Sequence, residues 1–197
     1  VVGLTAVVGV FLGLVSGYYG GWIDILLMRI VDILLAFPGL LLAIALVAVL
    51  GPSMRNVVIA LSVLGWVSFA RLVRGQVLSV REREFVLAAR TSGQGDLRIM
   101  LLHILPNVLS PVIVQATFGI AGVIISESSL SFLGLGAPPG TPSWGAMLSQ
   151  GKQVLLDAPH VSIFPGLAIM LVVLAFNFLG DGLRDRLDPR ARTGRRV

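Results

Sequence analysis

The chain has 197 residues and a formal net charge of +5, with 56% of its residues hydrophobic and 13% charged. Together with a mean hydropathy of +0.94, this composition excludes an ordinary soluble domain and indicates an integral membrane protein. Cysteine is absent and histidine occurs 2 times, so no disulfide framework, thiolate nucleophile or metal centre is predicted. The positive charge does not indicate nucleic acid as a partner, because no basic stripe is interleaved with aromatic residues.

The first predicted span covers residues 1–17, slightly short of the roughly 20 residues that cross a bilayer. Gly9, Gly13 and Gly17 recur on one helical face, a pattern that permits close helix packing in lipid. The alternative is that glycine is simply common in transmembrane helices. The chain begins inside an apolar run without methionine, so we expect a fragment rather than a signal peptide.

The next predicted span covers residues 33–50. The segment before it, residues 23–33, places its charged side chains on one side of a helical wheel, which indicates a helix at the membrane interface. Pro38 and the following glycine predict a kink or a break in the span. That kink could face a translocation path or be a packing irregularity.

Three further spans are predicted at residues 56–72, 107–126 and 160–180, which makes five in all. Within the span 107–126, small and polar residues share one face at spacings of four, three and four: Gln115, Gly119, Gly122 and Ser126. This face could line an aqueous path. It could also be a helix contact, which small residues at lipid-embedded interfaces favour slightly.

Residues 127–159 are predicted to form an outer loop without a span, in which a short helix from Trp144 to Leu156 lies on the surface. Glu127 is expected in the headgroup region, with a substrate role as the alternative. Except for Arg55 and Lys152, the basic residues lie in or beside the loops at residues 18–32, 73–106 and 181–197. The positive-inside rule therefore places these loops, and the C-terminus, in the cytoplasm.

The longest polar island covers residues 82–107 and has the pattern of a short helix, a glycine turn and a second helix closed by Pro106. Ala88 and Ala89 are good helix formers whose small side chains let a helix approach a partner closely. Gly93 allows the chain to reverse, because glycine takes positive φ without steric cost. We interpret this segment, the docking island, as a device for binding a partner protein.

The docking island resembles the cytoplasmic "EAA" loop of the membrane subunits of binding-protein-dependent ABC importers, although Leu87 stands where that loop has its glutamate. The residues that carry the resemblance are Ala88-Ala89, Gly93, His103 and Leu105-Pro106. Segments 17–22, 130–136 and 180–190 are similar to the C-type permease of dipeptide, oligopeptide and nickel transporters. The resemblance covers essentially the whole chain.

The resemblance implies an all-α, polytopic transmembrane helical bundle of the MetI-like permease fold, with five of six spans present and one helix missing before Val1. It implies one permease domain over residues 1–182 and a cytoplasmic tail over residues 183–197, in the inner membrane of a prokaryote. The implied partners are ATP-binding cassette ATPase subunits, a second permease in a heterodimer, and an extracytoplasmic solute-binding protein.

Two sets of site residues follow from these interpretations. Residues expected to couple the chain to an ATPase, through a close fit or polar contacts, are Glu84, Ala88, Ala89, Arg90, Gly93, Asp96, Leu105 and Pro106. Candidate pathway-lining residues are Pro38, Gln115, Gly119, Gly122 and Ser126. His103 is interpreted as a helix-end or docking residue rather than a ligand.

The sequence contains no pattern for catalysis. The nearest approach to a phosphate loop, residues 145–153, has its second glycine one residue too far and Gln153 in place of Ser or Thr. We therefore predict no catalytic residue and no cofactor, and expect partner subunits to hydrolyse ATP. The predicted function is import of di- or oligopeptides, with nickel or another small solute as the alternative substrate. A passive channel or ion-coupled transporter is a further alternative, although the span centres lack ionisable residues.

Overall fold

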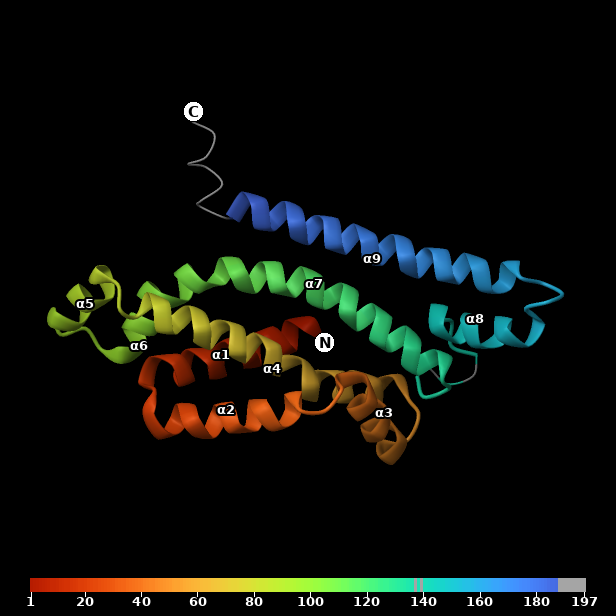
Figure 1. Ribbon diagram of the computed structural model, residues 1–197, viewed down its shortest axis with the longest axis horizontal. Coiled ribbons are helices and arrows are strands. Elements are labelled where there is room, and N and C mark those ends of the chain that lie inside the picture. Colours follow the sequence, from red (N-terminus) through yellow and green to blue (C-terminus); the bar gives the residue numbers. More distant parts are fainter. Residues whose placement is uncertain (137, 139, 188–197) are drawn as a thin grey trace. The chain divides into compact units, whose positions relative to one another are not determined.

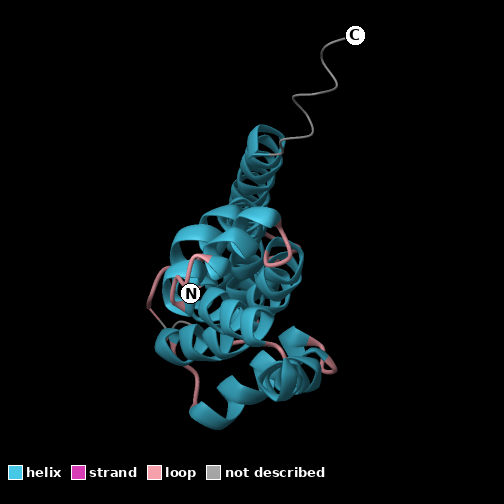
Figure 2. Ribbon diagram, turned by 90° about the vertical axis from the view of Figure 1, so that its left-hand side faces the viewer, coloured by secondary structure: helices cyan, strands magenta, loops and turns pink. Residues whose placement is uncertain are grey.

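The computed structural model describes residues 1–136, 138 and 140–187, and within these residues all regular structure is helical, without a strand (Figure 2). The described chain divides into two compact units. Unit 1 comprises residues 1–2, 37–64 and 117–180, and unit 2 comprises residues 3–36, 65–116 and the segment from Asp181. The prediction of an all-α fold is confirmed.

The elements follow one another along the chain as labelled in Figure 1. In order they are α1 (Val2–Tyr19), α2 (Gly21–Leu35), α3 (Gly39–Leu50), α4 (Met54–Val80), α5 (Glu84–Thr91), α6 (Asp96–Arg98), the π-helical turn η1 (Ile99–Ile104), α7 (Leu105–Phe132), α8 (Trp144–Gly151), the 3-10 turn η2 (Lys152–Val154) and α9 (His160–Leu187).

Several described helices are long and apolar enough to cross a membrane. Four stretches qualify on their own: Val2–Tyr19, Met54–Val80, Asp96–Phe132 and His160–Leu187. The pair Gly21–Leu35 and Gly39–Leu50 brings the total to 5 if the two helices together make one span. Four or five candidate spans agree with a polytopic bundle.

In unit 2, α1 and α4 lie side by side with their backbones almost in contact (Figure 1). A Cβ at Gly13 would lie 2.7 Å from the Ala70 carbonyl oxygen, and one at Gly17 would lie 2.7 Å from the Val77 Cβ. Real Cβ atoms do not come this close to other atoms, so only glycine fits. The predicted role of the glycine face in close helix packing is confirmed.

The helix α2 packs against the same surface of unit 2. Val31 of α2 is fully buried together with Val67 and Ala70 of α4, and Trp66 packs against this cluster. Apolar residues recurring at helical spacing bury one face of each helix in this way. The buried cluster holds α1, α2 and α4 together as the frame of unit 2.

The predicted break in the span 33–50 is confirmed, because the helix is interrupted at residues 36–38. Pro38 has no N–H, and its ring would clash with the carbonyl of the residue four positions earlier in a helix. It also disfavours helical geometry at Phe37, the residue before it. Pro38 instead stands at the N-terminal cap of α3, in an extended conformation with φ −59° and ψ 117°.

Three helices continue beyond the apolar segments from which their ends were predicted. The helix α4 continues to Val80 rather than residue 72, and α7 continues to Phe132 rather than residue 126. The helix α9 continues to Leu187, past the expected tail boundary at residue 183, which remains a prediction. Polar and charged residues such as Arg and Gln are good helix formers, so a helix need not end where the apolar run ends. The rest of the expected tail, residues 188–197, lies outside the described residues.

The second helix of the docking island is not closed by Pro106, contrary to the prediction. The turn η1 leads directly into α7, whose second residue is Pro106. Proline is tolerated there because the first turn of a helix does not need its N–H groups for intrahelical bonds. The Asn107 side-chain amide donates to the His103 carbonyl (2.7 Å), which satisfies an acceptor beside the proline.

In unit 1, α3, the first half of α4 and the end of α7 share a buried cluster of Ala43, Val47, Val57, Ala60 and Leu130. The helix α8 begins at Trp144 as predicted, capped by the Ser143 hydroxyl, which accepts from the Ala146 N–H (3.1 Å). It ends at Gly151, and η2 follows to Val154, so the helical part is slightly shorter than predicted. Residues 137 and 139 of the preceding loop lie outside the described residues.

Candidate coupling site and pathway face

The docking island lies wholly in unit 2 and reverses direction at Gly93. The Gly93 N–H donates to the Arg90 carbonyl (3.0 Å) and the Gln94 N–H donates to the Ala89 carbonyl (3.2 Å), which closes the end of α5. Gly93 has φ +72°, a conformation that is strained for any residue with a Cβ. The predicted reversal at this glycine is confirmed.

The inner face of α5 packs against η1. Val86 is fully buried and Ala89 is 5% exposed, while Ile99 and Ile104 of η1 are fully buried. The paired alanines therefore point in different directions. Ala89 belongs to the core of the docking island, and only Ala88 is exposed.

The outer face of α5 carries apolar side chains between charged ones. Phe85 is 40% exposed and Leu87 is 44% exposed, beside the exposed Ala88. Glu84 and Arg90 lie at the two ends of the helix, and both are exposed. An exposed apolar face with charges at its rim is typical of a surface that binds another protein. Phe85 was not among the predicted coupling residues, because an apolar residue in a short helix gives no sign in the sequence of whether it faces the core or the surface.

A side-chain hydrogen bond crosses the glycine turn. His103 Nε2 lies 2.9 Å from Gln94 Oε1, so η1 is tied to the loop that follows α5. No group of three or more His, Asp or Glu residues that could hold a metal ion occurs among the described residues. The structure thus gives His103 a partner inside the island, and its interpretation as a helix-end or docking residue remains a prediction. Periodicity could not have indicated that Gln94 is this partner.

The docking island is attached to the end of α1 through Tyr18. The Tyr18 hydroxyl donates to Asp96 Oδ1 (2.7 Å), and the Arg90 Cζ lies over the Tyr18 ring, 4.9 Å from its centroid. Tyr18 is only 6% exposed. Two of the predicted coupling residues, Arg90 and Asp96, thus contact one aromatic side chain that is not among the predicted coupling residues.

Two ion pairs join α2 to α4. Arg74 donates from Nε and Nη2 to the two carboxylate oxygens of Asp24 (2.5 and 2.6 Å), and the Ser16 hydroxyl donates to the same carboxylate (2.5 Å). Arg71 donates to Asp32 in a second, more exposed pair. The charged side of α2 that indicated an interfacial helix therefore faces, in part, the arginines of α4.

The last two predicted coupling residues lie where the island joins α7. Leu105 is half-buried and Pro106 is exposed. Neither belongs to the exposed face of α5 formed by Phe85, Leu87 and Ala88. Their contact with an ATPase remains a prediction.

The candidate pathway residues of α7 are accessible to different degrees. Gly122 is exposed, and a Cβ added there would meet no atom within 4 Å. Gln115, Gly119 and Ser126 are half-buried, and the Ser126 hydroxyl donates to the Gly122 carbonyl (2.8 Å). Pro38, at the start of α3, is exposed. Whether this face lines a path or contacts another chain remains a prediction.

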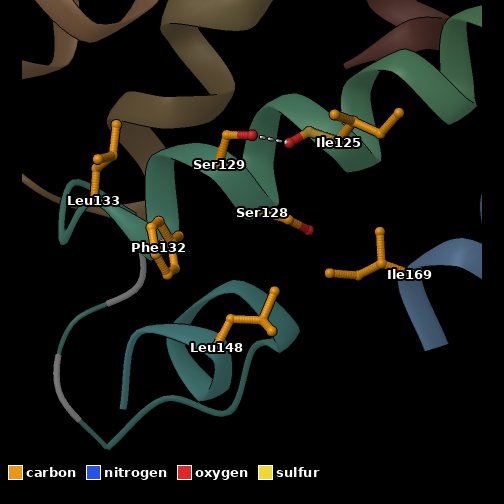
Figure 3. A pocket seen from close by; sticks show the side chains of 7 residues that line it. All are labelled: Ile125, Ser128, Ser129, Phe132, Leu133, Leu148 and Ile169. Atoms are coloured by element: carbon orange, nitrogen blue, oxygen red, sulfur yellow. Dashed lines mark hydrogen bonds between the residues drawn. The ribbon is translucent and has the colours of Figure 1, made fainter. Parts of the chain in front are cut away.

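A pocket of about 460 Å³ in unit 1 lies at the C-terminal end of the same face of α7 (Figure 3). Its walls are apolar and include Ile125 and Phe132 of α7, Leu148 of α8 and Ile169 of α9. The Ser129 hydroxyl donates to the Ile125 carbonyl (2.8 Å), so it is satisfied within its own helix. The Ser128 hydroxyl, also of the lining, is buried without a hydrogen-bond partner among the described residues, so the pocket can accept mainly apolar groups.

The helices define an all-helical protein with four or five candidate membrane spans among the described residues. Residues 9–193 match the family described as binding-protein-dependent transport system inner membrane component, and the chain belongs to this family. The resemblance noted in the sequence is thereby confirmed.

Two curated relatives are similar over most of the chain. The dipeptide transport system permease protein DppC of Alkalihalophilus pseudofirmus is 54% identical over 185 residues, which are 94% of this chain and 61% of that protein. The glutathione transport system permease protein GsiD of Escherichia coli O6:K15:H31 is 54% identical over 187 residues, which are 95% of this chain and 62% of that protein. The chain thus spans about three fifths of the length of these relatives.

A solved structure shares the fold. It is described as the inward-facing conformations of the MetNI methionine ABC transporter. The match covers 95% of this chain and 92% of the matched chain, with a TM-score of 0.67. The sequences are only 20% identical, so this likeness shows the fold alone. The MetI-like permease fold implied by the sequence is confirmed.

Proposed function

We propose that the chain is the permease subunit of an ABC importer, which forms the path for di- or oligopeptides across the inner membrane of a prokaryote. The observation that carries this proposal is the exposed face of α5. Membership of the family supports the import function. The relatives named for dipeptide and glutathione transport support a peptide substrate, since glutathione is itself a small peptide.

The geometry of α5 fits the binding of a helix in a groove. Phe85, Leu87 and Ala88 would enter the groove of an ATPase subunit, and Glu84 and Arg90 would make polar contacts at its rim. The buried Val86 and Ala89 fix α5 on η1. A movement of the ATPase would then displace the docking island as a body rather than bend α5 alone.

The chain would convert this displacement into alternating access. To move a two-state bundle from about 1:99 to 99:1, a partner must favour one state by ~5.5 kcal/mol. Hydrolysis of ATP by the partner subunits would provide this bias, so the chain itself needs no nucleotide site. A second permease would complete the path, and an extracytoplasmic binding protein would deliver the solute.

The path itself is assigned to the face of α7 that holds Gln115, Gly119, Gly122 and Ser126, together with Pro38. The exposed Gly122, with free space around it, supports this assignment. The apolar pocket at the end of the same face offers space for apolar side chains of a peptide. Nickel or another small solute is the alternative cargo.

The proposal is tested by purifying the full-length protein from native membranes and identifying the proteins that accompany it. We expect an ATP-binding cassette subunit with the wild-type protein, and at least about a tenfold loss of it with Phe85→Asp, since a buried carboxylate in the groove would be unpaired. The control is Leu156→Asp, because Leu156 is 97% exposed and lies outside the island. Absence of an ATPase from the wild-type preparation would refute the proposal.

A further inference from the structure

Three consecutive residues at the end of α1 each bind a different part of unit 2. Ser16 binds Asp24 of α2, the Gly17 carbonyl binds Arg81 after α4, and Tyr18 binds Asp96 of the docking island. The last carbonyls of a helix lack intrahelical partners, and water alone can satisfy them. Of the three contacts only that of the Gly17 carbonyl satisfies such a group, and the side-chain bonds of Ser16 and Tyr18 are additional to helix termination. We call residues 16–18 the α1 junction.

Tyr18 holds both sides of the glycine turn at once. Its hydroxyl donates to Asp96, the first residue of α6, and its ring lies under Arg90, in the last turn of α5. Tyr18 is 6% exposed whereas Asp96 is exposed, so the bond is partly buried, and its charged acceptor makes it stronger than a bond between neutral groups. The docking island cannot shift relative to α1 without breaking this bond or moving α1 with it.

The other two residues of the α1 junction pass such a movement to neighbouring helices. Ser16 shares the Asp24 carboxylate with Arg74 of α4, and Arg81 Nη1 donates to the Gly17 carbonyl at 2.9 Å. The close approach of the α1 and α4 backbones at Gly13 leaves little space in which one helix could slip past the other. A displacement at Tyr18 would thus reach α1, α2 and α4 together.

We propose that the α1 junction couples the docking island to the membrane helices of unit 2, and that Tyr18 is the positioning residue of this coupling. The proposal rests on the proposed function and specifies the contacts through which the movement of the ATPase reaches the helices. Tyr18 acts through Asp96 and Arg90 and is buried away from the outer face of α5. Without its hydroxyl, the island still folds on its own core, but of the two contacts that Tyr18 makes with it only that with Arg90 remains.

The test is Tyr18→Phe in the full-length protein, assembled with its partner permease and ATPase and reconstituted into liposomes with a dipeptide as the transported probe. The ring remains under Arg90, so we expect the ATPase to stay bound and ATP hydrolysis to continue. The number of ATP molecules hydrolysed per dipeptide transported should rise about tenfold, the factor that corresponds to one hydrogen bond to a charged group. The control is Tyr19→Phe, because Tyr19 is the neighbouring tyrosine and is 50% exposed.

A double-mutant cycle separates coupling from a general loss of structure. Asp96→Ala removes the same hydrogen bond from the other side, so the variant with both changes should be no worse coupled than the poorer single variant. If Asp96 instead acted on the ATPase independently of Tyr18, the two effects on the ratio of ATP to dipeptide would multiply. That result would overturn the proposal.

The remaining outcomes distinguish this proposal from the function on which it rests. If the ATPase accompanies the wild-type protein and Tyr18→Phe keeps the wild-type ratio of ATP to dipeptide, the coupling role of Tyr18 is refuted and the importer function stands. If no ATPase accompanies the wild-type protein, both are refuted. If Tyr18→Phe releases the ATPase, Tyr18 supports docking rather than coupling, and the proposal is also refuted.

Discussion

Gly9 of α1 and Phe69 of α4 lie so close that a Cβ on Gly9 would be 2.4 Å from the Cβ of Phe69. Packing of this kind, in which small residues allow two backbones to approach, stabilises helix pairs in lipid through dispersion contacts. It also makes the pair intolerant of larger side chains, because neither backbone can move without disturbing the buried cluster around Val67 and Ala70.

We therefore predict that Gly9→Leu separates α1 from α4 and lowers the stability of the full-length protein by about 1–3 kcal/mol or more. The matched control is Gly3→Leu on the same helix, where an added Cβ would meet no atom within 4 Å. Thermal unfolding in mild detergent measures both. Equal midpoints for the two variants would show that the close approach of α1 and α4 is not needed for stability.

The conformation of Gly93 leads to a second prediction. Gly93 has φ +72° whereas Gly95, two residues later, has φ −66°, and an added Cβ would meet nothing at either position. Gly93→Ala should therefore cost about 1–2 kcal/mol through backbone strain alone, while Gly95→Ala should be nearly neutral. Limited proteolysis of the docking island, measured as the cleavage rate, compares the two. Similar rates would contradict a role for the positive φ.

Gly93→Trp should act more severely on function. The residue is exposed at the reversal of the chain, so a large side chain there would add a bulky group beside α5 as well as strain. We expect the variant to insert into the membrane in normal amounts yet abolish dipeptide uptake. Uptake retained at the wild-type rate in a variant that is present at the wild-type level would contradict the assigned docking surface.

The two ion pairs between α2 and α4 should differ in strength. The side chains of Asp24 and Arg74 are 16% and 32% exposed, whereas those of Asp32 and Arg71 are 61% and 51% exposed. Asp24→Asn should cost about 2 kcal/mol, because it weakens three hydrogen bonds and leaves Arg74 without a counter-charge. Asp32→Asn should cost less than about 1 kcal/mol. Thermal unfolding that ranks the two variants in the opposite order would refute this reading of the pairs.

The sequence was sufficient for those features that depend on local pattern. The glycine face of α1, the reversal at Gly93 and the start of α8 at Trp144 all follow from spacing or from the chemistry of single residues. The effect of proline was predicted correctly at Pro38, which breaks a helix, but not at Pro106, which does not. The difference depends on where each proline lies within a helical turn. The π-helical turn before α7 could not be predicted, because it leaves no clear mark in the hydrophobic pattern.

The contacts within the candidate site could not have been predicted from periodicity. Tyr18 and Asp96 are 78 residues apart in the sequence, and their hydrogen bond depends on how α1 meets the docking island. The different directions of Ala88 and Ala89 depend on which face of α5 rests on η1. In both cases packing between elements, rather than a property of one segment, decides which residues are available to a partner.

The most direct test of the central claim, that the outer face of α5 binds an ATPase, is cysteine cross-linking in the assembled full-length transporter. The 197-residue chain contains no cysteine, so single substitutions can be compared within it. Ala88→Cys should cross-link to the ATPase subunit, whereas Ala89→Cys, at a position 5% exposed, should react slowly and form no such product. An Ala88→Cys variant that reacts readily with a soluble thiol reagent yet never cross-links to an ATPase would contradict the account.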